Sequence, residues 1–344
     1  WSGLTVNAAP EGDLAVDDAI AVTLSSGTAL NGSVKFTNLT AFTQNTGTGI
    51  NANASGCSGV SGAGRGPALT TNICAASTTG FGTSGSGSAN TAGGGGGYGG
   101  SGGASSSFAL GGPTYVSATA PVLYGSSGGG SNLGGLFGGS GGGLVRINAS
   151  GTITLNGTIT ADGGAGSIGG SGQATGGGSG GSIYISTNGS LTGSIALFSA
   201  KGGNGGDSVS DGGGGGGGRI ALVYGSTSYS LVDTFFTVDG GTAPDAGVPG
   251  QKGTVFVDEA GPNKFVFNDD NVRLLHGLTY TDFDWVVTSW TIDPSTNLGC
   301  DPLMGTGATP SVTTSGAMTL GGTFNCTTST AAGTGTISSS GTTV

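Results

Sequence analysis

Charged residues are scarce in this sequence. They make up 8% of its 344 residues, and 8 lysines and arginines stand against 18 aspartates and glutamates, which gives a net charge of −10 at pH 7. A protein that binds nucleic acid needs a basic face, and adhesion to anionic lipid needs clustered lysine and arginine. The charge balance therefore argues against nucleic acid and anionic membranes as partners.

Long apolar runs, proline and histidine are also scarce. No stretch of about 18 apolar residues occurs, so we expect no membrane insertion. Collagen is excluded because there are only ten prolines and the glycines follow no Gly-X-Y period. The single histidine, His276, lies among apolar residues, and we interpret it as a packed or surface side chain rather than a catalytic base.

Glycine, by contrast, is abundant, with 80 residues. Because glycine destabilises a helix by about 1 kcal/mol relative to alanine, a helical fold is excluded. The apolar residues gather in short runs of Val, Ile, Leu, Phe and Thr between the glycine blocks. This pattern is typical of strands and loops rather than of a disordered chain.

A repeat of glycine block and strand follows residue 140. Val145, Ile183, Ile220 and Val255 each come directly after such a block, at spacings of 38, 37 and 35 residues. A second strand that ends in Gly-Gly recurs at a matching offset in the first three units. Units of this kind bury an apolar face only by stacking. The sequence therefore predicts an all-β, glycine-rich β-solenoid, similar to a parallel β-helix, with a period of about 36 residues and these four side chains in one inward column.

The composition divides the chain into four parts. Residues 1–56 are interpreted as N-terminal β-strands of the same array, 57–140 as a Gly/Ser-rich insertion, 141–259 as the solenoid repeats and 260–344 as a small C-terminal β module. A structureless loop as long as the insertion is unusual in a compact domain. We therefore expect the insertion to pack as a layer on the solenoid, with its glycine runs side by side as extended strands.

The four cysteines fall into two pairs that are close in sequence. We predict the disulfides Cys57–Cys74 and Cys300–Cys326, because neither pair has zinc-ligand spacing and no His/Cys cluster accompanies them. Disulfides imply an oxidising compartment, so we expect the protein to be extracellular or at the cell surface. The candidate glycosylation sites are the asparagines of seven Asn-x-Ser/Thr sequons: Asn31, Asn38, Asn53, Asn148, Asn156, Asn188 and Asn325.

Three segments, 138–147, 176–185 and 212–224, join a glycine block directly to a strand. In this they resemble the glycine-rich, β-helical or solenoid-like repeats of large secreted and cell-surface proteins, which are adhesin-like or fibre-forming. The resemblance implies an extracellular architectural role. It carries over no catalytic residue.

Oxygen-rich clusters are the candidates for a metal site. Asp269, Asp270, Asp282 and Asp284 are candidate calcium ligands, because hard cations take six to eight oxygens. They match neither an EF-hand loop nor a Gly-Gly-x-Gly-x-Asp repeat, and the capping of turns is the competing interpretation. No other cofactor and no catalytic residue is expected.

We interpret the chain as a non-enzymatic structural subunit of an extracellular fibre or surface layer. A Ser-Gly motif recurs at 26–32, 150–157 and 315–322, and residues 340–344 hold the start of another copy, which suggests an uncapped terminal strand. Uncapped ends predict head-to-tail self-association into filaments. Two alternatives remain: a glycan-binding or adhesive module that uses the aromatic residues of 280–290, and a polysaccharide-active β-helix enzyme that uses aspartates beside the glycine loops.

Overall fold

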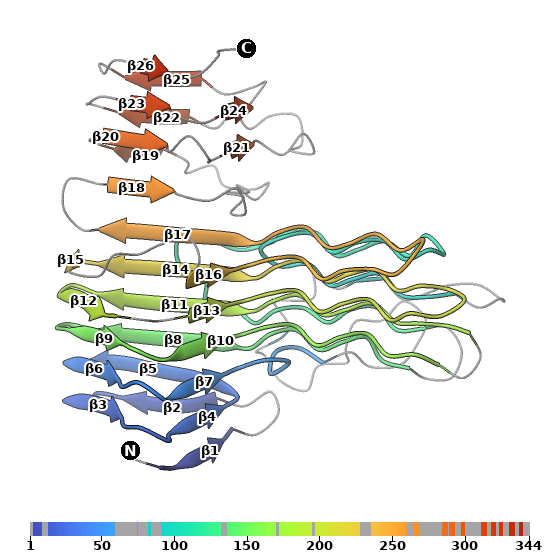
Figure 1. The fold of residues 1–344 in the computed structure, drawn as a ribbon, viewed down its shortest axis with the longest axis horizontal. Helices are drawn as coiled ribbons and strands as arrows, with labels where there is room; N and C mark the ends of the chain where they lie inside the picture. Colours follow the sequence, from blue (N-terminus) through green and yellow to red (C-terminus); the bar gives the residue numbers. More distant parts are fainter. Residues whose placement is uncertain are drawn as a thin grey trace.

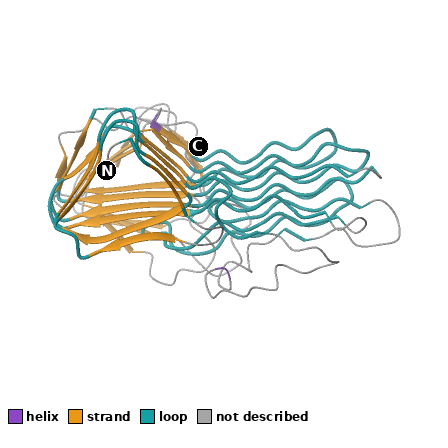
Figure 2. Cartoon of the chain, turned by 90° about the horizontal axis from the view of Figure 1, so that it is seen from below, coloured by secondary structure: helices purple, strands orange, loops and turns teal. Residues whose placement is uncertain are grey.

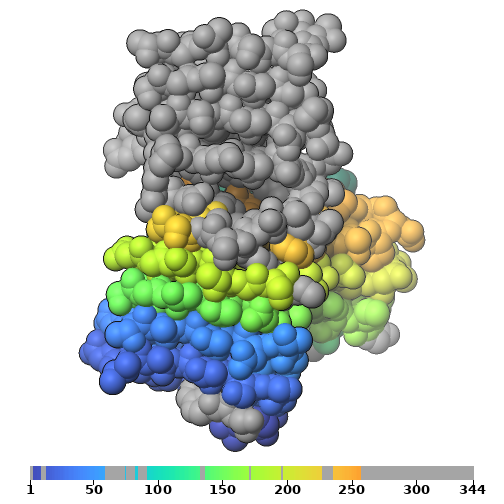
Figure 3. Space-filling view, turned by 60° about the vertical axis from the view of Figure 1, so that its left-hand side comes forward, coloured from blue at the N-terminus to red at the C-terminus, as the bar shows by residue number. Residues whose placement is uncertain are grey.

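The computed structural model is an all-β protein whose strands pair in parallel in stacked sheets (Figure 1). It describes residues 3–8, 13–58, 74, 82–83, 91–131, 136–169, 172–194, 197–227 and 235–259, and only strands beyond residue 259. Figure 3 shows the successive circuits of the chain as bands that follow one another in sequence order.

The chain visits three sheets in rotation as far as residue 259. The first sheet contains, in spatial order, β1 (Thr5–Asn7), β4 (Ala29–Asn31), β7 (Gly49–Asn51), β10 (Thr158–Thr160), β13 (Leu197–Ser199) and β16 (Phe236–Thr237). The second contains β17 (Thr254–Glu259), β14 (Arg219–Tyr224), β11 (Ser182–Thr187), β8 (Leu144–Ala149), β5 (Ser33–Leu39) and β2 (Asp13–Asp17). The third contains β15 (Ser226–Thr227), β12 (Ser190–Gly193), β9 (Ile153–Leu155), β6 (Ala41–Gln44) and β3 (Ala21–Leu24).

The later part of the chain adds three smaller parallel sheets. The four-stranded one contains β18 (Lys264–Phe267), β20 (Ser289–Ile292), β23 (Met318–Leu320) and β26 (Ile337–Ser339). The three-stranded one contains β19 (Asp284–Val287), β22 (Ser311–Thr314) and β25 (Thr330–Gly333). The two-stranded one contains β21 (Asn297–Gly299) and β24 (Thr323–Asn325). The β character expected for residues 260–344 is thus present in their described strands.

The residues that recur at the spacing of the sequence repeat pair with one another in the second sheet. Val145 pairs with Ile183, Ile183 with Ile220, and Ile220 with Val255. All four side chains are at most 4% exposed. The predicted inward column is confirmed, and it continues one circuit further to Val34. Such columns arise because side chains alternate between the two faces of a strand and parallel strands stack in register.

The N-terminal strands belong to the same array, as the sequence predicted. Ile50 pairs with Ile159 across β7 and β10, although 57–140 lies between them in sequence. Hydroxyl ladders join successive circuits on the outside of the third sheet. Thr154 lies 2.8 Å from Thr192, measured between the Oγ1 atoms.

One detail of the predicted unit is wrong. The sequence suggested two strands per circuit, whereas the structure has three, because a short strand of the third sheet lies between the other two. The Ser-Gly motif is also not a marker of equivalent positions. Its copy at 26–32 contains β4 of the first sheet, and its copy at 150–157 contains β9 of the third.

Candidate functional site

The glycine blocks form a slab that projects from the strands (Figure 2). After β10, β13 and β16 the chain runs outward as an extended arm, turns, and runs back to the next strand of the second sheet. Segments of the insertion lie beside the returning arms. We call this set the glycine slab: outward arms 161–166, 200–206 and 238–242, returning arms 138–143, 174–181, 212–218 and 248–253, and insertion segments 93–104, 109–113 and 125–130.

Backbone hydrogen bonds join these segments with a period of three residues. Successive N–H groups donate to three different neighbouring segments, and the residue three places on returns to the first neighbour. For the arm 174–181 the donor and acceptor pairs are Gly176 to Gly129, Gly177 to Gly213, Gly178 to Gly164, Ser179 to Ser126, Gly180 to Gly216 and Gly181 to Ala161. Three residues per turn is the period of the polyproline II helix, here built from glycine. The expectation that the glycine runs lie side by side is confirmed.

Glycine is required in the slab because the backbones approach closely. A β-carbon on Gly177 would lie 2.0 Å from the carbonyl oxygen of Gly203, and one on Gly215 would lie 2.0 Å from that of Gly178. No side chain fits into such a gap. Positive φ is not the cause, since the described glycines with positive φ all lie outside the arms: Gly3, Gly27, Gly32, Gly47, Gly172 and Gly193.

Side chains on two outward arms, and Asn53 directly after β7, accept from backbone N–H groups of the arm in the next circuit. The Oδ1 atom of Asn53 accepts from the Asp162 N–H at 2.8 Å, and Oδ1 of Asp162 accepts from the Lys201 N–H at 2.7 Å. Three residues after Lys201 on the same arm, Oδ1 of Asn204 accepts from the Thr242 N–H at 3.0 Å. An outer layer needs such partners, because a backbone donor without one is costly. Asp162 is therefore engaged in holding successive arms together.

Three buried tyrosines, Tyr98, Tyr115 and Tyr124, fix the insertion against the second sheet. The Tyr98 hydroxyl lies 2.5 Å from the Ser182 hydroxyl, at the start of β11. The Tyr115 hydroxyl donates to the Tyr124 carbonyl at 2.9 Å, and the Tyr98 and Tyr115 rings meet edge to face at 4.9 Å. Buried tyrosines combine a large apolar contact with one polar partner, which suits them to this anchoring.

Arg219 is the largest fully buried side chain among the described residues and lies at the same contact. Its guanidinium donates to the carbonyl oxygens of Tyr98 and Tyr115, at 3.3 and 3.0 Å, and to the Thr254 hydroxyl at 3.0 Å. The guanidinium carbon also lies 5.5 Å from the centre of the Tyr98 ring. A planar group with five donors can hold several carbonyls at once. Arg219 therefore joins two segments of the insertion to β14 and β17.

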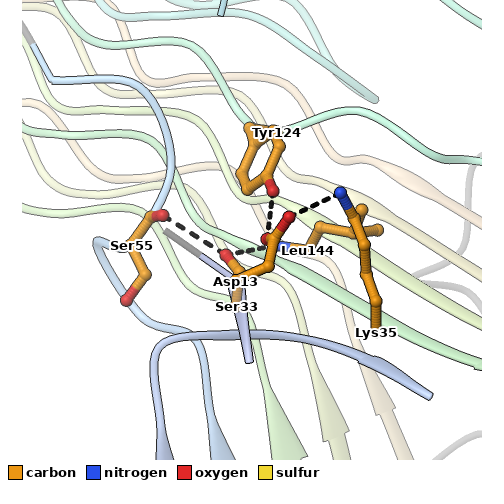
Figure 4. Close-up of polar contacts among 6 residues, drawn as sticks. All are labelled: Asp13, Ser33, Lys35, Ser55, Tyr124 and Leu144. Carbon is orange, nitrogen blue, oxygen red and sulfur yellow. Dashed lines mark hydrogen bonds and ion pairs between the residues drawn. The ribbon is translucent and has the colours of Figure 1, made fainter. Parts of the chain in front are cut away.

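A charged cluster anchors the third tyrosine (Figure 4). The Tyr124 hydroxyl donates to Oδ1 of Asp13, and Lys35 Nζ lies 2.5 Å from Oδ2 of the same carboxylate. Ser33 is next to them, and its hydroxyl accepts from the Leu144 N–H at 3.1 Å. Because both oxygens of Asp13 are engaged by a phenol and an ammonium, the cluster has the chemistry of a clamp rather than of an acid–base pair.

Burial, followed by the Asp13 carboxylate to which it donates, raises the pKa of the Tyr124 phenol well above its ordinary value. An acid whose pKa is raised on folding stabilises the protein below the unfolded pKa, and this contribution is lost as the pH rises above it. We expect the free energy of unfolding to fall above pH of about 10. A Tyr124→Phe variant should be less stable by roughly 1–3 kcal/mol at pH 7 and should show less of this alkaline loss.

Denaturant titrations at pH 7 and at alkaline pH measure both effects. Tyr184→Phe is the matched control, because Tyr184 lies on the outward face of β11 and leaves the clamp intact. An alkaline loss that is the same in Tyr124→Phe as in the wild type would contradict the assignment.

Most of the calcium ligands predicted from the sequence lie outside the residues that the structure describes. Asp269, Asp270 and Asp282 lie outside the described residues, as does His276, and only the backbone of Asp284 is described, in β19. In the part of the chain that the structure describes, no group of three or more His, Cys, Asp or Glu is placed to hold a metal ion. Calcium binding by these aspartates remains a prediction.

The first predicted disulfide is present. Cys57 and Cys74 are bonded, and both are buried beside Tyr124 and Leu144. It links the end of the N-terminal strands to the insertion, in a loop whose closure contributes about 3 kcal/mol in the chain-entropy model. The second predicted pair, Cys300–Cys326, lies outside the described residues. Strands β21 and β24, which end one residue before these cysteines, pair in register.

The seven sequon asparagines occupy different surroundings. Asn38, Asn53 and Asn188 are exposed, and Asn31, Asn148 and Asn156 are partly buried. The side chain of Asn325 is outside the described residues. Some of these asparagines already have structural partners: Asn156 accepts from the Ser194 N–H at 2.9 Å, as Asn53 does from Asp162. Glycosylation at these positions remains a prediction.

Comparisons with known proteins give no family. No family model, curated protein or solved structure matches the chain. Within the described residues, no helix is long and apolar enough to cross a membrane. The function must therefore be argued from the slab, its anchors and the sheet edges.

Proposed function

We propose that this chain is a structural subunit of an extracellular fibre or surface layer, and that its three-strand circuits are the coils of a β-solenoid that assembles head-to-tail. The observation that carries the proposal is the partial exposure of apolar side chains on the edge strands β1 and β2. In the circuit formed by β1 and β2, the apolar side chains Val6, Leu14 and Val16 are only partly buried. Their register partners one circuit further in are at most 1% exposed: Leu30, Val34 and Phe36.

An edge of this kind is a template for a further strand. Its backbone groups are directed along the stack, and its half-buried apolar column continues the core of the array. One added circuit would bury Leu14 and Val16 as Val34 and Phe36 are buried. When the added circuit belongs to another copy, the contact is heterologous and does not close on itself, which produces a filament. Further circuits in one longer chain would extend the array in the same manner.

The polar chemistry of the described residues supports an architectural role. The buried Arg219 and the Asp13 carboxylate bind groups of the insertion, and Tyr98 of the insertion binds Ser182 of β11. Asp239, one of the acids beside the glycine loops, pairs with Lys252 at 3.3 Å. The Cys57–Cys74 disulfide agrees with an oxidising compartment, and we therefore place the fibre outside the cell.

Negative-stain microscopy of the purified full chain tests the proposal. We expect filaments from the wild type and folded, unassembled particles from Leu14→Lys, because a charge in the edge column opposes the stacking of a further circuit. Leu197→Lys is the control, since Leu197 is 46% exposed on β13, away from the edge. A wild type that stays monodisperse at high concentration would contradict head-to-tail assembly. The same material on a glycan array, and in an assay for reducing ends, tests the two alternative functions.

A further inference from the structure

Exposed apolar side chains gather where the arms of the glycine slab turn back. Single exposed hydrophobic residues are normal on a protein surface, but a set gathered in one place marks a contact surface. Here each turn carries or directly adjoins one large apolar side chain, with exposed fractions between 46% and 86%: Phe137, Ile168, Val209, Val248 and Phe108. We call these five residues the tip row. Figure 2 shows that the arms extend away from the strands, and the turns lie where the outward arms end and the returning arms begin.

Contacts between the turns place the tip row in one continuous line. A β-carbon on Gly169 would lie 2.5 Å from the Leu136 side chain, so the turns that carry Phe137 and Ile168 are neighbours. Gln173 and Ser210 form a parallel bridge, which joins the Ile168 turn to the Val209 turn. The turns of Ile168, Val209 and Val248 belong to successive circuits, so the line runs along the stacking direction of the sheets.

Asp211 ties the remaining turns to this line. Its side chain is 4% exposed, and its two carboxylate oxygens accept from the N–H groups of Ser208 and Ala246. Its own N–H donates to the Ser106 hydroxyl at 2.7 Å, and its carbonyl accepts from the Ser106 N–H. The carboxylate and the backbone of one buried aspartate therefore hold together the turns that carry Val209, Val248 and Phe108.

Phe108 is doubly unusual. It is 86% exposed, and its φ is 64°, in the left-handed region that bulky residues rarely adopt. It ends a turn in which its N–H donates to the Ser105 carbonyl at 3.0 Å. Glycine would adopt this backbone without strain and without exposing a ring to water. A strained and exposed phenylalanine at this turn points to a function for the ring.

The charges around the tip row limit what it can contact. The described residues of the five turns contain no lysine or arginine, and Asp207 and Asp245 are exposed among them. The tip row therefore offers no basic side chain to pair with the phosphates of an acidic lipid or a nucleic acid. A suitable partner offers apolar side chains and repeats along the same axis.

We propose that the tip row is a lateral contact between two copies of this chain, which meet tip to tip. The proposal rests on the head-to-tail assembly proposed above. In a filament the tip rows of successive subunits form a repeating apolar stripe, and a second filament of the same chain carries a stripe with the same repeat. Such pairing buries the five side chains and converts single filaments into ribbons or a layer.

Sedimentation velocity of the full chain tests the contact without a need for filaments. We expect a dimer whose affinity rises with salt, because salt screens the repulsion among the Asp207 and Asp245 carboxylates while apolar contact persists. The double variant Phe108→Ser/Val209→Ser should weaken dimerisation by at least about tenfold, as for the loss of a central apolar anchor. Leu197→Ser, which removes an exposed leucine from β13, should leave it unchanged.

Microscopy then separates the two proposals. We expect paired filaments from the wild type and single filaments with an unchanged axial repeat from the tip variant. Absence of filaments, together with a dimer that the tip variant loses, would reject head-to-tail assembly and retain the tip contact. A wild type without a dimer, or with single filaments only, overturns the tip contact. Binding to zwitterionic phosphatidylcholine vesicles that the tip variant loses, with no dimer in solution, would overturn it in favour of a membrane surface.

Discussion

An Ile220→Asp variant is expected to lose its folded structure at room temperature. Ile220 is fully buried in the inward column between Ile183 and Val255. An unpaired carboxylate at this position has no partner in an apolar core, and we expect it to destabilise the protein by at least about 4 kcal/mol. Thermal melting followed by circular dichroism in the β-sheet region measures the effect.

The matched control is Val223→Asp on the same strand. Val223 lies three residues along β14, on the outward face, and is partly exposed. We expect its melting temperature to stay close to that of the wild type, because its carboxylate reaches water. Equal stabilities of the Ile220→Asp variant and the wild type would show that the column does not face inward.

A Gly215→Ala variant is expected to disrupt the slab although it adds one methyl group. The added β-carbon would lie 2.0 Å from the carbonyl oxygen of Gly178 and 2.5 Å from its carbonyl carbon. These are backbone atoms fixed by hydrogen bonds on several sides, so the neighbouring arm has to move. We expect a loss of roughly 3 kcal/mol, the upper end of the usual range for overpacking. Denaturant unfolding measures the loss.

Gly164→Ala is the control within the same slab. Its β-carbon would meet the Ser140 nitrogen at 3.2 Å and the Ala54 β-carbon at 3.3 Å, distances that small shifts can relieve. We expect a much smaller change in stability than for Gly215→Ala. Equal effects of the two substitutions would mean that close backbone packing is not what selects glycine in the arms.

Much of the array could be predicted from the sequence because its signal is local and periodic. The recurrence of Val145, Ile183, Ile220 and Val255 reflects one physical requirement, a buried β-branched residue at the same place in each circuit. The Cys57–Cys74 pair followed from proximity along the chain.

The third strand of each circuit was harder to predict because, unlike the equally short strands β10 and β13, it is not followed by a Gly-Gly pair at a constant offset. Strands such as β9 contain only three residues, and their Ser-Gly surroundings recur at non-equivalent corners of the array. A corner needs turn residues regardless of which sheet it leads into. The Ser-Gly motif therefore marks turns, but it does not show which strands pair with one another.

The anchors of the insertion were not predictable from spacing. Tyr98 and Arg219 are more than a hundred residues apart in sequence. Their contact depends on where the insertion packs against the returning arms, which the sequence does not indicate. A weak signal was present: Ser182 and Arg219 open their strands with polar residues, at positions that pair in register and are fully buried. A buried polar residue needs a partner, and here the insertion supplies it.

Hydrogen exchange of the glycine amides tests the central claim, that the glycine blocks form an ordered slab. In protein labelled uniformly with nitrogen-15, nuclear magnetic resonance spectra after transfer to heavy water follow the amides of the arms and of the strands together, and a second sample labelled at glycine only identifies the glycine signals. We expect the amides of arms 174–181 and 212–218 to exchange as slowly as those of the strands β11 and β14, since almost every one donates to a neighbouring segment. Complete exchange of these glycine amides within the first minutes, while the strands stay protected, would contradict the account.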